Sequence, residues 1–343
     1  MMFKKILNSS CPLISIVVVV FNMKREANRT LYSLSTKYQQ GVNSSDYEVI
    51  VVENGSSEPL STDFVASFGP NFKYYFLSTQ SKSPAGAINF GVNKSKGEFV
   101  GLMIDGARIL TPGVIKYALL AARLYPNPII GTLAWHLGPD IQCRSVMKGY
   151  TKETEDKLLS SINWMKNGYK LFEVSSFAES SKDGFFMPIA ESNCFFISRK
   201  TFYDLGGYDE RFDMPGGGLV NLDIYKRACE LLDSKLIIIL GEGTFHQIHG
   251  GVSTSILEKR NLLWRDFEKQ YIKIRKSKYF LPNKSTEYIG HVPPELFRFI
   301  QHSVQNLVKI LYEKHKYFGY KVHNFLSKLK NVLIRFFYSL KSV

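Results

Sequence analysis

Two groups of polar residues have the types and the spacing that binding and catalysis require. Asp105 directly follows a run of apolar residues, and Arg108 stands three positions later. His246 and His249 lie in the glycine-rich stretch 241–251. Carboxylates and imidazoles are common metal ligands, and a guanidinium can bind two phosphate oxygens at once. The two groups could therefore hold a metal ion or a phosphorylated ligand, whereas a closed zinc site would need further ligands close by in sequence.

The apolar runs around these residues predict an α/β fold. Strands are expected at 13–21, 47–52, 74–77, 99–104 and 235–240, and helices at 25–38, 84–97 and 153–166. Strands that alternate with helices at this spacing form βαβ units, which predicts a mostly parallel central sheet flanked by helices. Asp105 would then lie at the carboxyl edge of the sheet, where open α/β sheets bind their ligands.

Several function classes are disfavoured by motifs that the sequence lacks. The turn after the first predicted strand has no GxGxxG, which disfavours a dinucleotide-binding enzyme, and no GxxxxGK[ST] indicates a P-loop. The same turn, NMKR at 22–25, lacks the glycines that a nucleotidyltransferase of similar fold would need. The four cysteines are scattered and form no CxxC, which is typical of free thiols in a reducing compartment.

Positive charge is concentrated in the last quarter of the chain. The 343 residues carry a formal net charge of +14. Residues 255–343 hold 18 lysines and arginines against 6 acidic residues, while residues 1–254 hold 26 against 24. An anionic partner is therefore expected for the C-terminal part, either a membrane surface or a nucleic acid. No segment has the pattern of a signal peptide or the apolar length of a spanning helix, so a cytoplasmic location is expected.

Five motifs occur in the order and approximate spacing of one enzyme family. They are VVVVFN at 17–22, VIVVENGSS at 49–57, AGAIN at 85–89, KGEFVGLMID at 96–105 and DLGGYDE at 204–210. Over roughly residues 13–250 the chain resembles family 2 glycosyltransferases with the GT-A fold, in which helices flank a Rossmann-like sheet. The resemblance implies transfer of a sugar from a nucleotide-diphosphate donor, such as a UDP-sugar, with inversion at the anomeric carbon.

The resemblance also assigns residues to the donor site. Those expected around the nucleotide base and ribose, or on the helix that approaches the donor, are Phe21, Asn22, Glu53, Asn54, Gly86 and Asn89. A glutamate can accept a hydrogen bond from a pyrimidine N–H or a ribose hydroxyl, and an asparagine can both donate and accept. The alternative interpretation is structural, with Glu53 and Asn54 closing a turn and Gly86 allowing close packing at a helix start.

Asp105 corresponds to the first aspartate of the family's D-x-D motif, which holds Mg²⁺ or Mn²⁺ at the diphosphate. Ala107 replaces the second aspartate and cannot bind a metal. We therefore expect Arg108 to supply part of the positive charge, while Asp105 holds sugar hydroxyls or, with His249, a weakly bound metal. The resemblance further implies that His246 or His249 contacts the diphosphate. The alternative for Arg108 is a solvated loop charge.

An inverting transferase needs a carboxylate that takes the proton from the acceptor hydroxyl. The family supplies it from a Glu-Asp pair at the start of a helix, but here the pair falls on Val220 and Asn221. Asp223 is the nearest carboxylate and the first candidate for the catalytic base, and Glu191 is the second. The alternative for Asp223 is an ion pair with Arg227 one helical turn later.

These expectations divide the chain into a glycosyltransferase domain at 1–254, with an acceptor-side insertion at 132–190, and a basic, mainly helical extension at 255–343. Residues 305–343 combine a basic face with an apolar face, which is typical of a helix on a membrane surface. Packing of that face on the catalytic domain or on a second subunit is the alternative. Nucleic acid is not expected as a partner, because the sequence has no recognised nucleic-acid-binding motif.

The predicted function is that of an inverting glycosyltransferase in surface polysaccharide biosynthesis, with a glycan or lipid-linked acceptor. It would act in the cytoplasm, peripherally on the inner face of the cytoplasmic membrane if the C-terminal segment binds lipid. The alternative is a catalytically degenerate protein that binds sugar nucleotides or serves as a scaffold, because Ala107, Val220 and Asn221 stand where the family has carboxylates.

Overall fold

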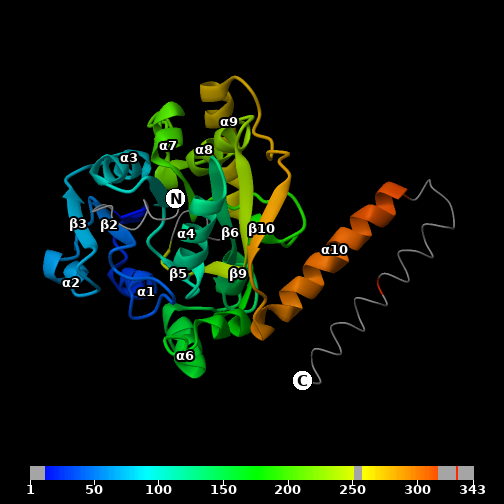
Figure 1. Cartoon of the computed structure of the whole chain (residues 1–343), viewed down its shortest axis with the longest axis horizontal. Coiled ribbons are helices and arrows are strands. Elements are labelled where there is room, and N and C mark those ends of the chain that lie inside the picture. Colours follow the sequence, from blue (N-terminus) through cyan, green and yellow to red (C-terminus); the bar gives the residue numbers. More distant parts are fainter. Residues whose placement is uncertain (1–11, 251–256, 316–329, 331–343) are drawn as a thin grey trace, which may run out of the picture.

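A computed structural model describes residues 12–250, 257–315 and 330 of the chain. Within these residues, ten strands form one central sheet (Figure 1). The strands are β1 (Ile14–Val20), β2 (Tyr47–Asn54), β3 (Phe72–Leu77), β4 (Phe99–Met103), β5 (Arg108–Leu110), β6 (Pro128–Leu137), β7 (Ser175–Phe177), β8 (Phe195–Ser198), β9 (Lys235–His246) and β10 (Thr286–Gly290). Their order is β10-β9-β6-β8-β4-β1-β2-β3, with β5 paired to β9 and β7 paired to β6.

Helices connect the strands and cover the sheet. They are α1 (Lys24–Leu34), α2 (Thr62–Ala66), α3 (Ala85–Lys94), α4 (Val114–Leu124), α5 (Gln142–Met147), α6 (Lys152–Ile162), α7 (Arg199–Asp204), α8 (Val220–Cys229), α9 (Leu257–Arg275) and α10 (Phe297–His315). α1, α2 and α3 lie around β2 and β3, whereas α10 extends away from the body of the molecule (Figure 1).

The sheet is mostly parallel, as predicted. β1 pairs in parallel with β2 and β4, β2 with β3, and β9 with β6 and β10. β8 runs antiparallel between β4 and β6. β1 and β4 are buried along their whole length, which explains their continuous apolar sequences. The predicted α/β class, with helices flanking the sheet and a helix near the C-terminus, is confirmed.

The apolar core forms two layers, one on each face of the sheet. In β1, Val17 and Val19 belong to one layer and Ile16 and Val18 to the other, because successive side chains of a strand point to opposite faces. Residues of α3 and α8 lie in the first layer, and residues of α1 and α4 in the second. Each fully buried valine or isoleucine contributes about 1.5–3 kcal/mol, so both layers hold β1 and fix its carboxyl end.

β9 is longer than predicted. The sequence predicts a strand at 235–240 followed by a glycine-rich loop, but pairing with β5 and β6 continues the strand to His246. Gly241 has a φ of +88°, and a Cβ at this position would lie 1.7 Å from the carbonyl oxygen of His291. A glycine is therefore required here by close approach of another backbone, and it does not mark a loop. Gly251 lies outside the described residues.

Other boundaries also differ from expectation, since the helices predicted to end at 38, 97 and 166 end at Leu34, Lys94 and Ile162. α3 begins at Ala85, one residue later than predicted, with Pro84 as the flanking residue. Within the segment predicted to be mainly helical, β10 pairs in parallel with β9 and extends the sheet. The paired strands are far apart in the chain, so no local sequence pattern predicts the pairing. The division of the chain at residue 254 stays a prediction.

The C-terminal segment is described only in part. Phe299, Ile300 and Ser303 are buried near the start of α10. None of the helices in the part of the chain that the structure describes is long and apolar enough to cross a membrane. Most of the predicted amphipathic face lies at 316–329 and 331–343, outside the described residues, so its surface role stays a prediction.

Glu242 is a buried carboxylate of β9 that no predicted site includes. Its oxygens accept hydrogen bonds from the Gly113 N–H at 2.9 Å and the Tyr169 hydroxyl at 2.8 Å. Burial raises the pKa of Glu242 to about 7, above the value of about 4.3 for an unfolded glutamate. The folded state therefore binds the proton more tightly. The stability that this group contributes is present below about pH 4 and is lost as the pH rises through 7.

Glu242→Gln is expected to stabilise the protein at high pH only. The free energy of unfolding should rise by about 3 kcal/mol at pH 8 and change little at pH 4. The amide can keep both contacts, because its oxygen can accept from Gly113 and its NH₂ group can donate to the Tyr169 hydroxyl. Chemical denaturation at the two pH values measures the difference. An equal effect at both would contradict the raised pKa.

Candidate functional site

Asp105 lies just beyond the carboxyl end of β4, where the sequence predicts it. A Cβ at the next residue, Gly106, would lie 2.8 Å from the carbonyl oxygen of Val19, so the backbone passes too close to β1 for a side chain. The Ala107 N–H donates to Asp105 Oδ1 at 3.0 Å. Ala107 itself is fully buried in the apolar layer that contains α1. The missing second carboxylate is thus replaced by a core residue whose backbone orients Asp105.

β5 and β9 bring the histidines to Asp105. Arg108 and His246 are directly opposite each other in the antiparallel β5–β9 pair. His246 Nε2 lies 2.9 Å from Asp105 Oδ2, and His249 Nε2 lies 3.8 Å from Asp105 Oδ1. The Nε2 atoms of the two histidines are 3.2 Å apart. The structure therefore brings the two groups of polar residues singled out in the sequence into one cluster.

Burial and the neighbouring charges shift the pKa values of Asp105 and His246. Burial favours the neutral form of Asp105, but His249, His246 and Arg108 outweigh it and hold the pKa of this carboxyl well below its usual range. Burial lowers the pKa of His246 to about 4, although Asp105 opposes that shift. At neutral pH, Asp105 is therefore an anion, and His246 is a neutral ring with one donor and one acceptor nitrogen.

Arg108 is not the solvated loop charge of the alternative interpretation. It is 6% exposed and belongs to β5. Its Nε lies 3.7 Å from Asp105 Oδ2, beyond hydrogen-bond distance. Within the described residues, Arg108 Nε and Nη1 have no hydrogen-bond partner. Buried guanidinium donors normally have an acceptor, and the oxygens of a phosphate group fit that need.

Asp105, His246 and His249 form a group that could hold a metal ion. Their ligand atoms all lie within 4.8 Å of one another. This set contains both predicted metal ligands, Asp105 and His249, and adds His246. Two imidazole nitrogens and one carboxylate oxygen suit Mn²⁺ and later first-row ions, whereas Mg²⁺ prefers oxygen ligands. The residues present therefore fit a divalent transition metal better than magnesium.

The predicted nucleotide-binding residues begin at the adjacent ends of β1 and β2. Phe21 is 49% exposed. Asn22 follows it with a φ of +49°. Its Oδ1 accepts the Ser57 N–H at 2.9 Å, and its own N–H donates to Ser56 Oγ at 2.8 Å. These hydrogen bonds join the loops after β1 and β2 into one surface beside an exposed aromatic ring.

Glu53 and Asn54 are engaged by the protein itself. Glu53 is 1% exposed, and its carboxylate accepts hydrogen bonds from the Leu60 N–H at 3.0 Å and from the Ser56 hydroxyl. Asn54 Nδ2 donates to the carbonyl oxygen of Ser83 at 3.3 Å. Such contacts are those of residues that close a turn. A role of either side chain in base recognition stays a prediction.

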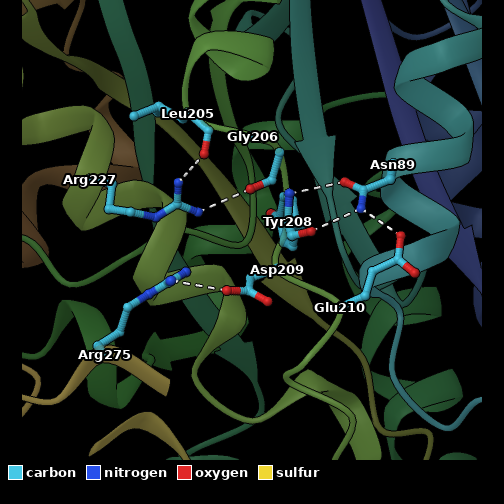
Figure 2. A pocket seen from close by; sticks show the side chains of 9 residues that line it. Asn89, Leu205, Gly206, Tyr208, Asp209, Glu210, Arg227 and Arg275 are labelled. Carbon is cyan, nitrogen blue, oxygen red and sulfur yellow. Dashed lines mark hydrogen bonds and ion pairs between the residues drawn. The ribbon is translucent and has the colours of Figure 1, made fainter. Parts of the chain in front are cut away.

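Gly86 and Asn89 face the turn at 206–210. Asn89 Oδ1 accepts the Tyr208 N–H, and its Nδ2 donates to Glu210 Oε1, each at 2.9 Å (Figure 2). A Cβ at Gly86 would lie 3.5 Å from the Glu210 carboxylate. Through these contacts Asn89 holds the turn in place. Its contact with the donor stays a prediction.

An open pocket of about 430 Å³ lies between Asn89, this turn, Arg227 and Arg275 (Figure 2). Arg275 Nη1 lies 3.0 Å from Asp209 Oδ2, and Arg227 donates to two nearby backbone carbonyls. Both guanidiniums are thus already paired within the protein. The pocket is a hollow beside an internal ion-pair network, and its lining does not include Asp105.

Asp223 is fully buried, and arginines bind both of its oxygens. Arg227 Nε donates to Oδ2 at 2.8 Å, and Arg275 donates to Oδ1 and Oδ2, each at 2.7 Å. The ion pair with Arg227 is the alternative that the sequence left open, and Arg275 adds a second partner. An acceptor hydroxyl could reach the carboxylate only by displacing a guanidinium. The geometry therefore does not favour Asp223 as the catalytic base.

Glu191 lies on the approach to the carboxyl edge of the sheet. β8 runs antiparallel to β4 with Phe195 opposite Leu102. The residues that precede Phe195 therefore continue toward the level at which β4 ends and Asp105 follows. Glu191 lies four residues before Phe195, in the segment that leads into β8 from the carboxyl end of β4.

Glu191 is buried and is held by Asn193 and Ser180. It is 2% exposed, its Oε1 accepts the Asn193 N–H at 2.7 Å, and its Oε2 accepts the Ser180 hydroxyl at 2.5 Å. Burial raises the pKa of the Cys194 thiol to about 12, while Arg108 and Glu191 act on that thiol in opposite directions.

Two contributors to the site escape the sequence analysis. His136 is opposite His246 across the β6–β9 pair, with ring centroids 5.5 Å apart. Glu155 accepts the Ile248 N–H at 2.8 Å, between the two histidines. In the sequence, His136 is one of several residues with ring side chains at 132–190. It is recognised only from the pairing of β6 with β9, which are far apart in the chain. No sequence signal marks Glu155.

Comparisons with known proteins support the family resemblance. Residues 15–122 match the family described as Glycosyl transferase family 2. Over 301 residues the chain is 23% identical to an uncharacterized glycosyltransferase of Rickettsia felis (strain ATCC VR-1525 / URRWXCal2). The alignment covers 84% of this chain and 44% of that protein, so the chain spans less than half the length of this relative.

Solved structures of S. aureus TarS give weaker matches. The crystal structure of TarS covers 88% of this chain and 43% of its own, with 13% identity and a TM-score of 0.48. The structure of TarS 1–349 in complex with UDP covers 88% and 72%, with 13% identity and a TM-score of 0.47. At this level of similarity the alignment carries no information on individual residues.

The family match runs from β1 to α4, which is the part of the chain that holds Asp105 and Arg108. It includes the predicted base-binding turns after β1 and β2 and the start of α3. The match of residues 15–122 to glycosyl transferase family 2 confirms the family resemblance that the sequence motifs predict.

Proposed function

We propose that this chain is an inverting glycosyltransferase that moves a sugar from a nucleotide-diphosphate donor to a glycan or lipid-linked acceptor in surface polysaccharide biosynthesis. The observation that carries the proposal is the meeting of Asp105, Arg108, His246 and His249 at one edge of the sheet. Ligands of open α/β sheets bind at this edge. These side chains suit a diphosphate and its counter-ion, and the family match supports sugar transfer as the reaction.

On the donor side, Arg108 would bind the diphosphate. Its buried N–H groups can donate to phosphate oxygens, and its positive charge would offset the negative charge that develops on the leaving nucleotide diphosphate. Asp105 is held as an anion, so it can accept hydrogen bonds from sugar hydroxyls. The proposal keeps the family's assignment around the nucleotide and the donor helix, which comprises Phe21, Asn22, Glu53, Asn54, Gly86 and Asn89.

A divalent cation, where one is bound, would be held by Asp105, His246 and His249 and would neutralise charge on the diphosphate. The protein itself would supply the remaining hydrogen bonds to the donor. His246 is neutral at pH 7 because it is buried, and it can donate one hydrogen bond to an anionic neighbour. Partial burial of the cluster limits the access of water to it, which strengthens each of these electrostatic contacts.

On the acceptor side, we assign Glu191 as the general base. Its Oε2 accepts one hydrogen bond in the described structure, from Ser180, and a carboxylate oxygen can accept a second from an acceptor hydroxyl. The acceptor oxygen would attack the anomeric carbon from the face opposite the leaving group while Glu191 takes its proton. The bond to the nucleotide diphosphate breaks as the new glycosidic bond forms, which inverts the configuration.

Arg108→Ala is expected to lower kcat/KM for the donor by about 10²-fold, because a buried charge directed at the diphosphate is lost. Arg123→Ala, on the exposed side of α4, is the matched control and should behave like the wild type. Activity of the wild type in EDTA separates the two sources of charge. Retained activity supports Arg108 as the main one, whereas complete loss that Mn²⁺ restores would contradict this role.

A panel of nucleotide-diphosphate sugars tests the proposed function. Saturable thermal stabilisation by one donor, followed by release of its nucleotide diphosphate when acceptor glycans are added, is the expected result. The anomeric configuration of the product, determined by NMR, tests inversion. If none of the donors stabilises the protein or is turned over, the proposed function fails.

A second candidate function is binding of a sugar nucleotide without transfer. Asn221 stands where the family has a carboxylate, and both oxygens of Asp223 are bound by arginines. These observations leave the usual source of the base without a free carboxylate. Stabilisation by a donor without release of nucleotide diphosphate, for any acceptor supplied, would favour this function over the first.

We further propose that residues 1–254 form the transferase unit, with 132–190 on its acceptor side, and that 255–343 form a basic extension. Residues 305–343 hold eight basic residues against one acidic residue, which supports contact with the anionic inner face of the cytoplasmic membrane. Association with a second subunit is the alternative. Co-sedimentation with anionic liposomes tests the proposal, and equal co-sedimentation with neutral liposomes would contradict it.

A further inference from the structure

The segment that carries His246 and His249 is held by charged residues from a different part of the chain. We propose that Glu155, on α6, is a positioning residue for these two histidines and that an ion-pair cluster between α1 and α6 holds Glu155 in turn. The inference rests on the proposed function, because it concerns the same donor site. α6 lies beyond the residues that match the family.

Beyond His246 the chain leaves the β9 ladder and turns across the site. The Gln247 N–H donates to the carbonyl oxygen of Ala107 at 2.9 Å. The next N–H, that of Ile248, donates to Glu155 Oε2 at 2.8 Å. Ile248 directly precedes His249, so the Glu155 carboxylate sets the position of the peptide from which the His249 ring projects.

α1 holds the opposite side of this segment. The Gln247 side chain is fully buried, and its Nε2 donates to the carbonyl oxygen of Glu26 at 3.1 Å and to Thr30 Oγ1 at 3.3 Å. Arg25 Nη1 reaches the Ile248 carbonyl oxygen at 3.4 Å. The backbone between the histidines is therefore fixed from two directions, by α1 and by Glu155 of α6.

Glu155 is fully buried, and α1 supplies the charges that balance it. Its Oε1 lies 3.2 Å from Arg25 Nη2 and 3.7 Å from Arg29 Nη1. The two arginines are one helical turn apart, and Asp156 accepts hydrogen bonds from both. Asp156 thereby orients the guanidiniums toward Glu155. Burial raises the pKa of Glu155 to about 7, although the Ile248 N–H and the two arginines oppose that shift.

The ligand distances make this positioning important. His249 Nε2 lies 3.8 Å from Asp105 Oδ1 and 3.2 Å from His246 Nε2. A displacement of the Ile248 peptide by about 1 Å would separate these atoms, and a misplacement of that size is enough to impair binding and catalysis. Glu155 reaches the donor site through the backbone, at the Ile248 N–H.

Three variants test the proposal. Glu155→Ala removes the acceptor of the Ile248 N–H, whereas Glu155→Gln keeps an oxygen that can accept it. Glu48→Ala is the matched control, because Glu48 is also buried, accepts a backbone N–H from Lys96 at 2.6 Å and pairs with Lys73. Glu48 lies at the amino end of β2, at the edge of the sheet away from the site.

Hydrogen exchange of the Ile248 amide gives a readout that is independent of activity. Exchange should be about tenfold faster in Glu155→Ala, as expected for loss of a hydrogen bond to a charged group. It should stay within about threefold of the wild type in Glu155→Gln and in Glu48→Ala. Unchanged exchange in Glu155→Ala would overturn the positioning role.

Donor kinetics give the second readout. Glu155→Ala should raise the donor KM by about 10–100-fold, the usual effect of losing a residue that orients a ligand-binding side chain. Glu48→Ala should lower the Tm without raising KM, and Glu155→Gln should restore most of the donor affinity. Faster exchange at Ile248 with an unchanged donor KM would overturn the inference.

The same variants separate failure of the inference from failure of the proposed function. If the wild type transfers no sugar, the proposed function fails, and the affinity for Mn²⁺ measured by calorimetry replaces KM. A loss of Mn²⁺ affinity of about 10–100-fold in Glu155→Ala, together with faster exchange, would then uphold the positioning role. An Mn²⁺ affinity equal to that of the wild type would overturn it.

Discussion

Asp105→Asn is expected to lower kcat/KM for sugar transfer on the order of 10³-fold while leaving the fold intact. Asp105 contacts His246 and His249 and faces Arg108, so its negative charge organises every other group of the donor cluster. Asparagine has the same shape and can still accept the Ala107 N–H. The substitution therefore removes the charge and leaves the backbone turn in place.

Steady-state transfer kinetics and the Tm of the variant measure this expectation. Asp204→Asn is the matched control, because Asp204 is an exposed carboxylate that pairs with Lys200 one helical turn away. The control should retain full activity, since such surface pairs contribute little. An Asp105→Asn protein with activity within tenfold of the wild type would contradict a central role for Asp105.

Asp223→Asn and Glu191→Gln are expected to separate stability from catalysis. Asp223→Asn removes the charge that faces Arg227 and Arg275, and loss of one partner from a buried ion cluster lowers the free energy of unfolding by about 3–5 kcal/mol. Glu191→Gln can keep all three hydrogen bonds of the carboxylate, because its oxygen can accept from the Asn193 N–H and Nδ2 and its NH₂ group can donate to the Ser180 hydroxyl, so it should fold normally. It should lose about 10²–10⁴-fold in kcat, because an amide cannot take a proton from the acceptor.

Chemical denaturation and kcat, measured for both variants, decide which carboxylate is the catalytic base. A well-folded Asp223→Asn protein without turnover, beside a fully active Glu191→Gln protein, would return the role of the base to Asp223. Full activity in both variants would exclude both carboxylates as the base. Absence of turnover in the wild type would instead favour the function of binding without transfer.

Much of the fold is predictable from sequence because its central strands are buried on both faces. β1, β2 and β4 have continuous apolar sequences, and α1 and α6 have apolar residues at helical spacing. The end of β9 is not predictable in this way. Gly241 and Gly243 look like loop residues, and their strand conformation depends on β5, β6 and the backbone near His291. Residues far along the chain decide that outcome.

The same limit applies to the site. The order of motifs points to Asp105, the glycine-rich stretch 241–251 points to the two histidines, and the structure brings these residues together. The sequence cannot show that Arg275 shares Asp223 with Arg227, or that Glu155 accepts the Ile248 N–H. The type of a residue determines which contacts its side chain can make. Which partner it contacts depends on how distant elements pack.

The antiparallel pairing of β5 with β9 has a consequence for the newly made protein. Asp105 and Arg108 leave the ribosome well before His246 and His249, and β9 must pair with β5 and β6 before the two groups can meet. Contacts between such distant segments close late in folding, because the intervening chain must first be ordered. A nascent chain thus exposes the aspartate without the histidines, and the cluster assembles only after β9 has been synthesised and paired with β5.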